Sequence, residues 1–197
     1  MLDRCYAVLQ AILGLAPEAA SANPAVPARL FAALLSNTSL VEGASMLQTL
    51  KALLAAFPTL QPSVTKEALQ FIFAAGAKAT SPDAECRQAA VSVLAALCTA
   101  PHTEQIDRAV CEFLLEALRT DPSVMVADEV LNAFMDIYGS DEGHRTVFDD
   151  LRVLVEVQQQ AATFKRRGKE AGGEEQMQVK ETALNVKRFA KYMSGGN

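Results

Sequence analysis

The chain has 197 residues, of which 50% are hydrophobic and none is Trp, and its net charge is −5. This length suffices for one domain with a sizeable core or for a short array of repeats, and the Ala- and Leu-rich composition favours helix over strand. Charged residues or Pro interrupt every apolar run before the roughly 18 residues that a membrane span needs, so the sequence excludes a transmembrane helix.

The N-terminal segment predicts a helix over residues 2–15 with apolar side chains around much of its circumference. Asp3 and the helical spacing of the apolar residues argue against a signal peptide. Because this helix lacks a polar capping face, we expect further repeats before it in a longer protein. Residues 16–27, rich in Ala and Pro, predict a flexible connector.

Three helical segments, beginning at Ser45, Glu85 and Met125, align with a period of 40 residues. Within each copy the apolar residues recur at i, i+4, i+7, i+8 and i+11, which is one face of an α-helix. Ser81-Pro82 and Asp121-Pro122 predict two helix starts, each with an N-cap oxygen and a Pro at the first helical position. The aligned columns are Met46/Cys86/Val126, Leu50/Ala90/Val130, Leu53/Val93/Ala133, Leu54/Leu94/Phe134 and Phe57/Leu97/Ile137.

A second set of helices alternates with the first. Residues 64–78 and 105–119 match at an offset of 41, and residues 27–37 form a shorter version. Two helices in about 40 residues with short turns are typical of HEAT and armadillo repeats. We therefore predict an all-α fold, a HEAT/armadillo-like α-solenoid of about four antiparallel helix pairs over residues 1–164. A plain helical bundle is the alternative.

The C-terminal part predicts a helix from 145 to about 166, a flexible charged loop over 165–176, and a basic amphipathic capping helix over 177–193. Residues 194–197 predict a disordered tail. The four cysteines form no CxxC pair and lie in apolar stretches, so we interpret them as buried hydrophobic residues: Cys5, Cys86, Cys98 and Cys111. His102 and His144 fall in predicted loops and do not suggest catalysis.

Negative charge is concentrated between Asp121 and Asp150, where eight carboxylates are opposed by one Arg. Residues 1–164 carry a net charge of −9, and residues 165–197 carry +4. The acids either form a solvated face or bind a basic partner. Acid–base catalysis requires buried, paired carboxylates, whereas these acids lie on the polar face of a predicted helix, so we do not expect catalysis. Their spacing also does not match the calcium-binding loop of an EF-hand. The candidate cargo-binding residues are Asp128, Glu129, Asn132, Asp136, Asp141, Glu142, Asp149 and Asp150.

The last predicted helix presents Lys180, Lys187, Arg188 and Lys191 opposite its apolar face. These residues form either an exposed face of the capping helix or a contact for RNA or another partner. Only Phe189 and Tyr192 supply aromatic side chains there, which disfavours direct nucleic-acid binding. The sequence offers no nucleophile motif, phosphate-binding loop or metal cluster, so we expect no enzyme activity, no cofactor and no metal.

The stretch "LNAFMDIYGSDEGHRTVFDDLRVL" (131–154) and the later "KETALNVKRFAKYM" (180–193) resemble the C-terminal end of the symportins, also called HEAT-repeat-containing protein 3. The resemblance covers about 60 residues and its motifs are structural. The matching positions are Asp136, Ile137, Tyr138, Asp141, Glu142, Asn185, Arg188, Phe189, Lys191 and Tyr192.

This resemblance implies an adaptor and chaperone in the cytoplasm and nucleus. Symportins bind the two basic ribosomal proteins that travel with 5S ribosomal RNA, and bring them to the nucleus with an import receptor of the karyopherin class. The family's basic import signal ending in Pro-Tyr is absent, as are most of its N-terminal repeats. We therefore expect either a fragment, whose receptor binds through regions outside this chain, or a divergent protein without autonomous import. A generic HEAT-repeat interaction scaffold is the alternative function, and RNA binding through residues 165–191 is another.

Overall fold

The computed structural model describes residues 25–36, 43–57, 66–99, 104–140, 142–170 and 173–193. Helices joined by short turns make up these ranges, and no strand occurs within them. The chain divides into two compact units, residues 1–102 and 103–197, which are described one at a time.

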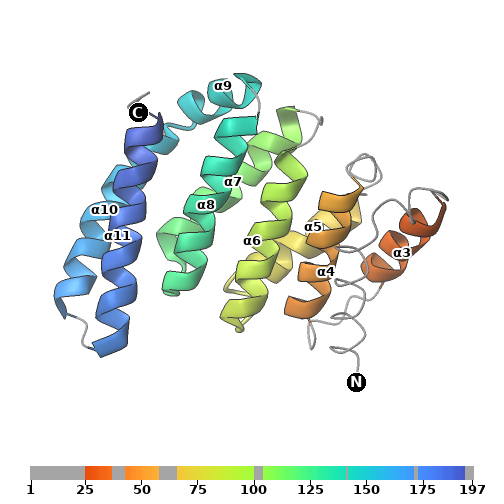
Figure 1. The fold of residues 1–197 in the computed structure, drawn as a ribbon, viewed down its shortest axis with the longest axis horizontal. Helices are drawn as coiled ribbons and strands as arrows, with labels where there is room; N and C mark the ends of the chain where they lie inside the picture. Colours follow the sequence, from red (N-terminus) through yellow and green to blue (C-terminus); the bar gives the residue numbers. More distant parts are fainter. Residues whose placement is uncertain are drawn as a thin grey trace. The chain divides into compact units, whose positions relative to one another are not determined.

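The first unit contains α3 (Ala25–Ser36), α4 (Gly43–Ala56), α5 (Lys66–Gly76) and α6 (Ala84–Cys98), as Figure 1 shows. α6 packs against both α4 and α5, and α3 packs against α4. Because α6 has neighbours on two sides, it is buried around most of its circumference, including the polar Ser92. Its many small residues allow this close approach.

Two hydrogen-bonding side chains shape the turn before α6. The guanidinium of Arg87, which is only 3% exposed, donates to the carbonyl oxygens of Ser81 (2.9 Å) and Pro82 (2.8 Å). The Asp83 carboxylate accepts from the Glu85 amide at 3.0 Å and is the N-cap. The predicted start, with Ser81 as cap and Pro82 as the first helical residue, is therefore wrong. The cap is Asp83, two residues further along the chain, and its carboxylate accepts from the free Glu85 amide in the first turn.

The second predicted helix start is displaced in the same direction. The Asp121 carboxylate accepts from the Ser123 amide at 2.8 Å, and α8 begins only at Val124. Asp121 thus stabilises the turn in front of the helix, and Pro122 lies before the first helical residue rather than within the first turn.

The second unit contains α7 (Glu104–Thr120), α8 (Val124–Ser140), α9 (Glu142–Asp150), α10 (Val153–Glu170) and α11 (Gly173–Met193). α11 packs against α8 and α10, while α7 contacts α8, α9 and α10. In Figure 1, α8 and α11 lie side by side, and the short α9 covers the end of α8. The predicted antiparallel helix pairs are confirmed within each unit.

The 40-residue period is confirmed by burial. All fifteen residues of the five aligned columns are at most 8% exposed. In the second helix set, Ile72 and Val110 are buried, whereas Leu69 and Phe113 are half-buried. Cys86, Cys98 and Cys111 are free and buried as predicted, and Cys5 lies outside the described residues.

The C-terminal boundaries differ from the prediction. The single helix predicted from 145 is divided into α9 and α10 at Arg152, whose φ of 53° is left-handed. The predicted loop over 165–176 is wrong for most of its length, because α10 continues to Glu170 and α11 begins at Gly173. Packing of α10 against α11 outweighs the low helix propensity of the glycines. The predictions for residues 2–15 and 194–197, and most of the connector, fall outside the described ranges.

Candidate protein-binding surfaces

A cluster of five aromatic side chains joins α8, α9 and α11. Phe134 lies at its centre, with ring centroids 5.5 Å from Phe148 and 5.9 Å from Phe189, and all three residues are fully buried. The Tyr138 ring lies 5.5 Å from Phe148 and 5.8 Å from Tyr192. Such aromatic pairs add to the stabilisation that burial provides. The cluster therefore fixes the positions of α8, α9 and α11 relative to one another.

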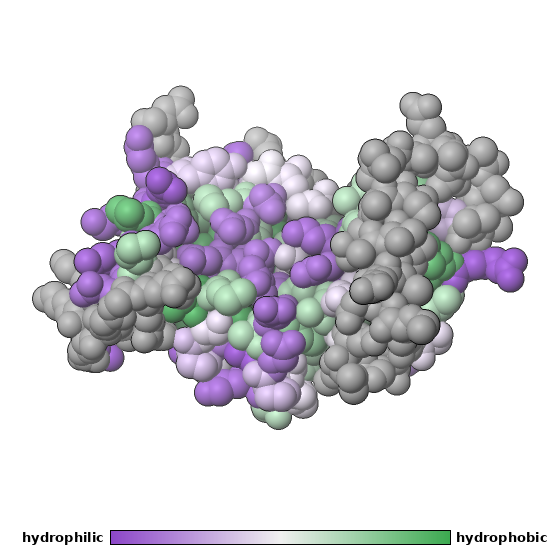
Figure 2. Space-filling view, turned by 60° about the horizontal axis from the view of Figure 1, so that its bottom comes forward, coloured by the Kyte–Doolittle hydropathy of each residue, from purple (hydrophilic) through white to green (hydrophobic). Residues whose placement is uncertain are grey.

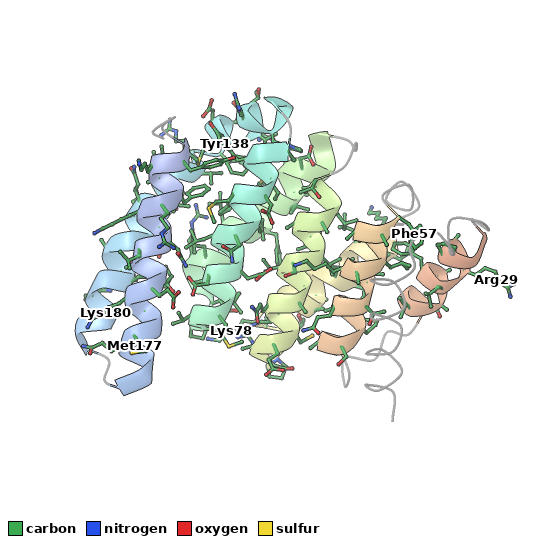
Figure 3. The ribbon with its side chains drawn as sticks, viewed as in Figure 1. Arg29, Phe57, Lys78, Tyr138, Met177 and Lys180 are labelled. Carbon is green, nitrogen blue, oxygen red and sulfur yellow. The ribbon has the colours of Figure 1, made fainter. Side chains whose placement is uncertain are left out.

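Tyr138 connects this cluster to the surface, near the junction of α8 and α9 in Figure 3. The guanidinium carbon of Arg145 lies 5.4 Å from its ring centroid, and its hydroxyl donates to the Met193 carbonyl at 3.5 Å. The neighbouring Gly139 has no side chain, and a Cβ there would lie 2.7 Å from the Tyr192 hydroxyl. This glycine therefore permits the close approach of α11 to the end of α8.

Asp128 belongs to the contact between α8 and α11. It is half-buried, and its Oδ1 accepts from the Asn185 amide at 3.3 Å. Burial raises the pKa of the Asp128 carboxyl, while hydrogen bonds with Thr182 and Asn185 act in the opposite direction. The Arg188 guanidinium donates to the side-chain oxygen Oδ1 of Asn185 at 3.3 Å, so the hydrogen-bond network also includes a cation. Asp128 thus helps to hold α11 in place.

The other candidate residues on α8, two acids and one asparagine, share its outer side. Asn132 and Asp136 are exposed and Glu129 is half-buried, at positions that recur with helical spacing along one line. We call Glu129, Asn132 and Asp136 the α8 acidic stripe. Met125, 42% exposed, continues the same line toward the start of the helix.

The remaining candidate acids lie on another helix or outside the described residues. Asp149 and Asp150 are exposed on α9, and the Asp150 carboxylate lies 2.8 Å from the guanidinium of Arg108. Asp141 is outside the described residues, as is the side chain of Glu142. The predicted acids therefore do not share one helix face.

Sequence reasoning missed a second group of acids, on α7 and α10. Glu112 and Glu116 are exposed on α7. Arg119 bonds Glu156 of α10 at 3.0 Å and lies 3.7 Å from Glu116, so it links the two helices. The four-residue spacing of Glu112 and Glu116 is a sequence signal for one exposed face, whereas the pairing with Glu156 has no local signal.

His144 is not in a loop, as the sequence predicted, but is buried within α9. Its Nε2 lies 3.3 Å from the carboxylate of Asp107, which is also buried, and its Nδ1 lies 3.1 Å from the Ser140 hydroxyl. The Ser140 hydroxyl donates its single proton to the Ile137 carbonyl at 2.8 Å. These contacts fasten α9 to α7 and α8. His102 lies outside the described residues.

The basic candidates form a separate surface on α11. Lys180, Lys187, Arg188 and Lys191 are all exposed. Exposed hydrophobic side chains lie on the same helix, because Met177 is 72% and Leu184 52% exposed. Figure 3 shows Met177 and Lys180 near the start of α11.

The structure also bears on metal and membrane binding. Among the residues it describes, no group of three or more His, Cys, Asp or Glu side chains is placed to hold a metal ion. The described helices include none that is both long and apolar enough to cross a membrane.

Comparison with known proteins identifies the family. Searches among curated proteins and among solved structures match nothing to this chain. The family described as "SYO1-like, TPR repeats" matches residues 6–196, and SYO1 is the yeast symportin. This match covers both described units and confirms the resemblance that the residues near Tyr138 and Tyr192 indicated. The chain therefore belongs to the SYO1-like family of helical-repeat proteins.

Proposed function

We propose that this chain acts by binding, without catalysis, as an adaptor and chaperone for basic ribosomal proteins of the 5S ribonucleoprotein. It would work in the cytoplasm and nucleus during nuclear import and ribosome assembly, together with a karyopherin. Membership in the SYO1-like family supports a repeat-based scaffold. The observation that carries the choice of cargo is the α8 acidic stripe within a body whose residues 1–164 have a net charge of −9.

Electrostatics gives this proposal its mechanism. Ribosomal proteins are strongly basic before they meet RNA, and an acidic surface attracts them while it repels nucleic acid. Many weak charge contacts raise the association rate and the specificity, and salt screens them. Release on the ribosomal RNA then follows, because the phosphates compete for the same cations.

The candidate acids differ in their availability for this role. The α8 acidic stripe lies on the outer side of its helix, so Asp136 meets a partner without unpacking the fold. Asp150 is bonded to Arg108, but both side chains are about half exposed, at 56% and 43%, and an exposed pair of this kind exchanges partners at little cost. Asp128 is engaged with α11 and contributes least.

The test is a salt titration of binding to a panel of purified basic ribosomal proteins, with 5S RNA alone as a separate ligand. The variant Glu129→Gln/Asp136→Asn/Asp149→Asn removes three negative charges from the second unit. A matched variant, Glu67→Gln/Asp83→Asn/Glu85→Gln, removes three exposed ones from the first.

We expect one ribosomal protein to bind with a Kd below about 1 μM, weakened by salt and about tenfold by the first variant only. Equal weak binding to every cationic protein, unchanged in that variant, would show an acidic surface without a dedicated cargo.

The alternative, a generic HEAT-repeat interaction scaffold, is favoured by one observation. Met125, Val155 and Leu184 are exposed hydrophobic residues on three different helices of the second unit. A scaffold that binds through them would show little dependence on salt, and the same titration therefore separates the two functions.

A further inference from the structure

The outer side of α11 combines exposed hydrophobic and basic side chains in a regular pattern. Met177 and Leu184 are seven residues apart, as are Lys180 and Lys187, and Lys191 follows after one more turn. At about 100° per residue, these five positions fall within one arc of roughly 80°. We call them the α11 basic stripe. Seven residues correspond to about 10 Å along the helix.

Packing of the fold does not account for this stripe. The opposite side of α11 supplies the buried contacts with α8 and α10, through Val179, Thr182, Val186 and Phe189. Met177 at 72% and Leu184 at 52% exposure take no comparable part in the core. Figure 2 shows hydrophobic side chains lying among hydrophilic ones over the end of the second unit that α10 and α11 form.

The charge around the stripe is opposite to that of the body. Lys180, Lys187, Arg188 and Lys191 outnumber Glu181, the one acid on this side of the helix from Met177 onward, and give a net charge of +3. A surface with two hydrophobic side chains along its middle and lysines beside them is complementary to a helix of the same pattern and opposite charge.

We infer that the α11 basic stripe binds an acidic amphipathic helix of a partner protein. Leucine-type side chains of that helix, spaced by seven residues, would cover Met177 and Leu184. Its flanking carboxylates would pair with Lys180, Lys187 and Lys191. This partner differs from the basic cargo of the proposed function, and the inference does not depend on that function.

Two other classes of ligand fit this surface less well. RNA binding draws on open aromatic faces, but the exposed Tyr192 ring packs against Tyr138, and Met177 and Leu184 offer nothing to phosphates. A membrane-bound helix buries a full apolar face in lipid, whereas the apolar face of α11 is already packed against α8 and α10.

The experiment measures binding of the full chain to a fluorescein-labelled peptide of about five helical turns, with Leu pairs at i, i+7 flanked by Glu. A scrambled peptide of the same composition, a single-stranded RNA and anionic phosphatidylserine vesicles serve as competing ligands. Two variants test the stripe: Lys180→Gln/Lys187→Gln/Lys191→Gln removes charge, and Met177→Ser/Leu184→Ser removes apolar surface.

Each variant has a matched control at exposed positions elsewhere. Arg29→Gln/Lys66→Gln/Lys78→Gln removes three positive charges from the first unit, and Met125→Ser/Val155→Ser removes two exposed hydrophobic side chains from α8 and α10. Circular dichroism of all four variants verifies that they retain the helical fold.

We expect the patterned peptide to bind more tightly than the scrambled one, and both stripe variants to weaken it at least about fivefold while the controls do not. Equal binding of the scrambled peptide, or loss in the charge variant alone, would overturn the inference. Tighter binding of RNA or of the vesicles, lost in the same variants, would overturn it in favour of those ligands.

Discussion

The carboxylate of Asp128 accepts a hydrogen bond from the side-chain amide of Asn185, which lies 57 residues further along the chain. Thr182, fully buried on the same face of α11, also hydrogen-bonds this carboxyl. The sequence places Asp128 among the acids of a polar helix face, but in the structure its carboxylate also joins α8 to α11. Its burial has a measurable thermodynamic consequence.

Asp128→Asn should raise the free energy of unfolding at pH 7. Burial raises the pKa of the folded carboxyl above its ordinary value of 3.8, so the fold favours the neutral form. The wild type therefore gains stability as the pH falls through the folded pKa, while Asn keeps an acceptor for Asn185 at every pH. Urea unfolding at pH 7 and pH 3.5 measures the difference, which should shrink at the lower pH. The exposed Asp149→Asn is the control, and a variant less stable than wild type at pH 7 would contradict this account.

His144→Ala should lower the free energy of unfolding by about 2–3 kcal/mol, because it removes the hydrogen-bonding partner on α9 of the buried Asp107 carboxyl. The matched control is Arg108→Ala, which breaks the exposed pair with Asp150 and should cost about 0–1 kcal/mol. Denaturant midpoints of both variants provide the measurement. Equal losses would mean that the His144 contact is no more than a surface pair.

Gly139→Ala should stabilise the protein less when Tyr192 is present than when it is replaced by Phe. With Tyr192 present, the new Cβ meets its hydroxyl at 2.7 Å and displaces the ring from Tyr138. In Tyr192→Phe the hydroxyl is absent, and the higher helix propensity of Ala should stabilise the protein by up to about 1 kcal/mol. Thermal unfolding of the four proteins in this cycle gives the coupling. Additive effects would show that the close approach of Tyr192 places no constraint on Gly139.

The buried thiols should be unreactive in the folded protein. Burial raises the pKa of Cys111 to about 12 and also raises the pKa of Cys86. In a Cys5→Ser background, a thiol reagent such as DTNB at pH 8 should react with Cys86, Cys98 and Cys111 only as the chain unfolds. Rapid labelling without denaturant would show that the units open frequently under native conditions.

The periodic part of the fold could be predicted from the sequence because it depends on local spacing. Met46, Cys86 and Val126 occupy one column of apolar residues, and each is buried because a helix presents every such residue to the same side. The two helix starts marked by Pro82 and Pro122 were predicted within about two residues. Ser81 and Asp83 both offer a capping oxygen; the helix uses that of Asp83, and Arg87 binds the Ser81 carbonyl.

The pairings of charges could not be predicted, because they join residues far apart in the sequence. Arg108 bonds Asp150 across 42 residues, and Arg119 bonds Glu156 across 37. A sum of charges over a segment treats Asp150 and Glu156 as available to a binding partner, although an arginine already contacts each of them. For the same reason, no local pattern indicates that His144 and Asp107 form a buried contact, or that Asp128 faces α11.

The aromatic cluster adds to the packing of α11 at its C-terminal end. Phe189 is fully buried within it and Tyr192 packs against Tyr138, whereas Met177 in the second turn is mostly exposed. We expect amide protons near residue 177 to exchange with solvent before those near residue 189, where the aromatic rings add to the packing. A partner that binds the first part of the α11 basic stripe would slow this exchange.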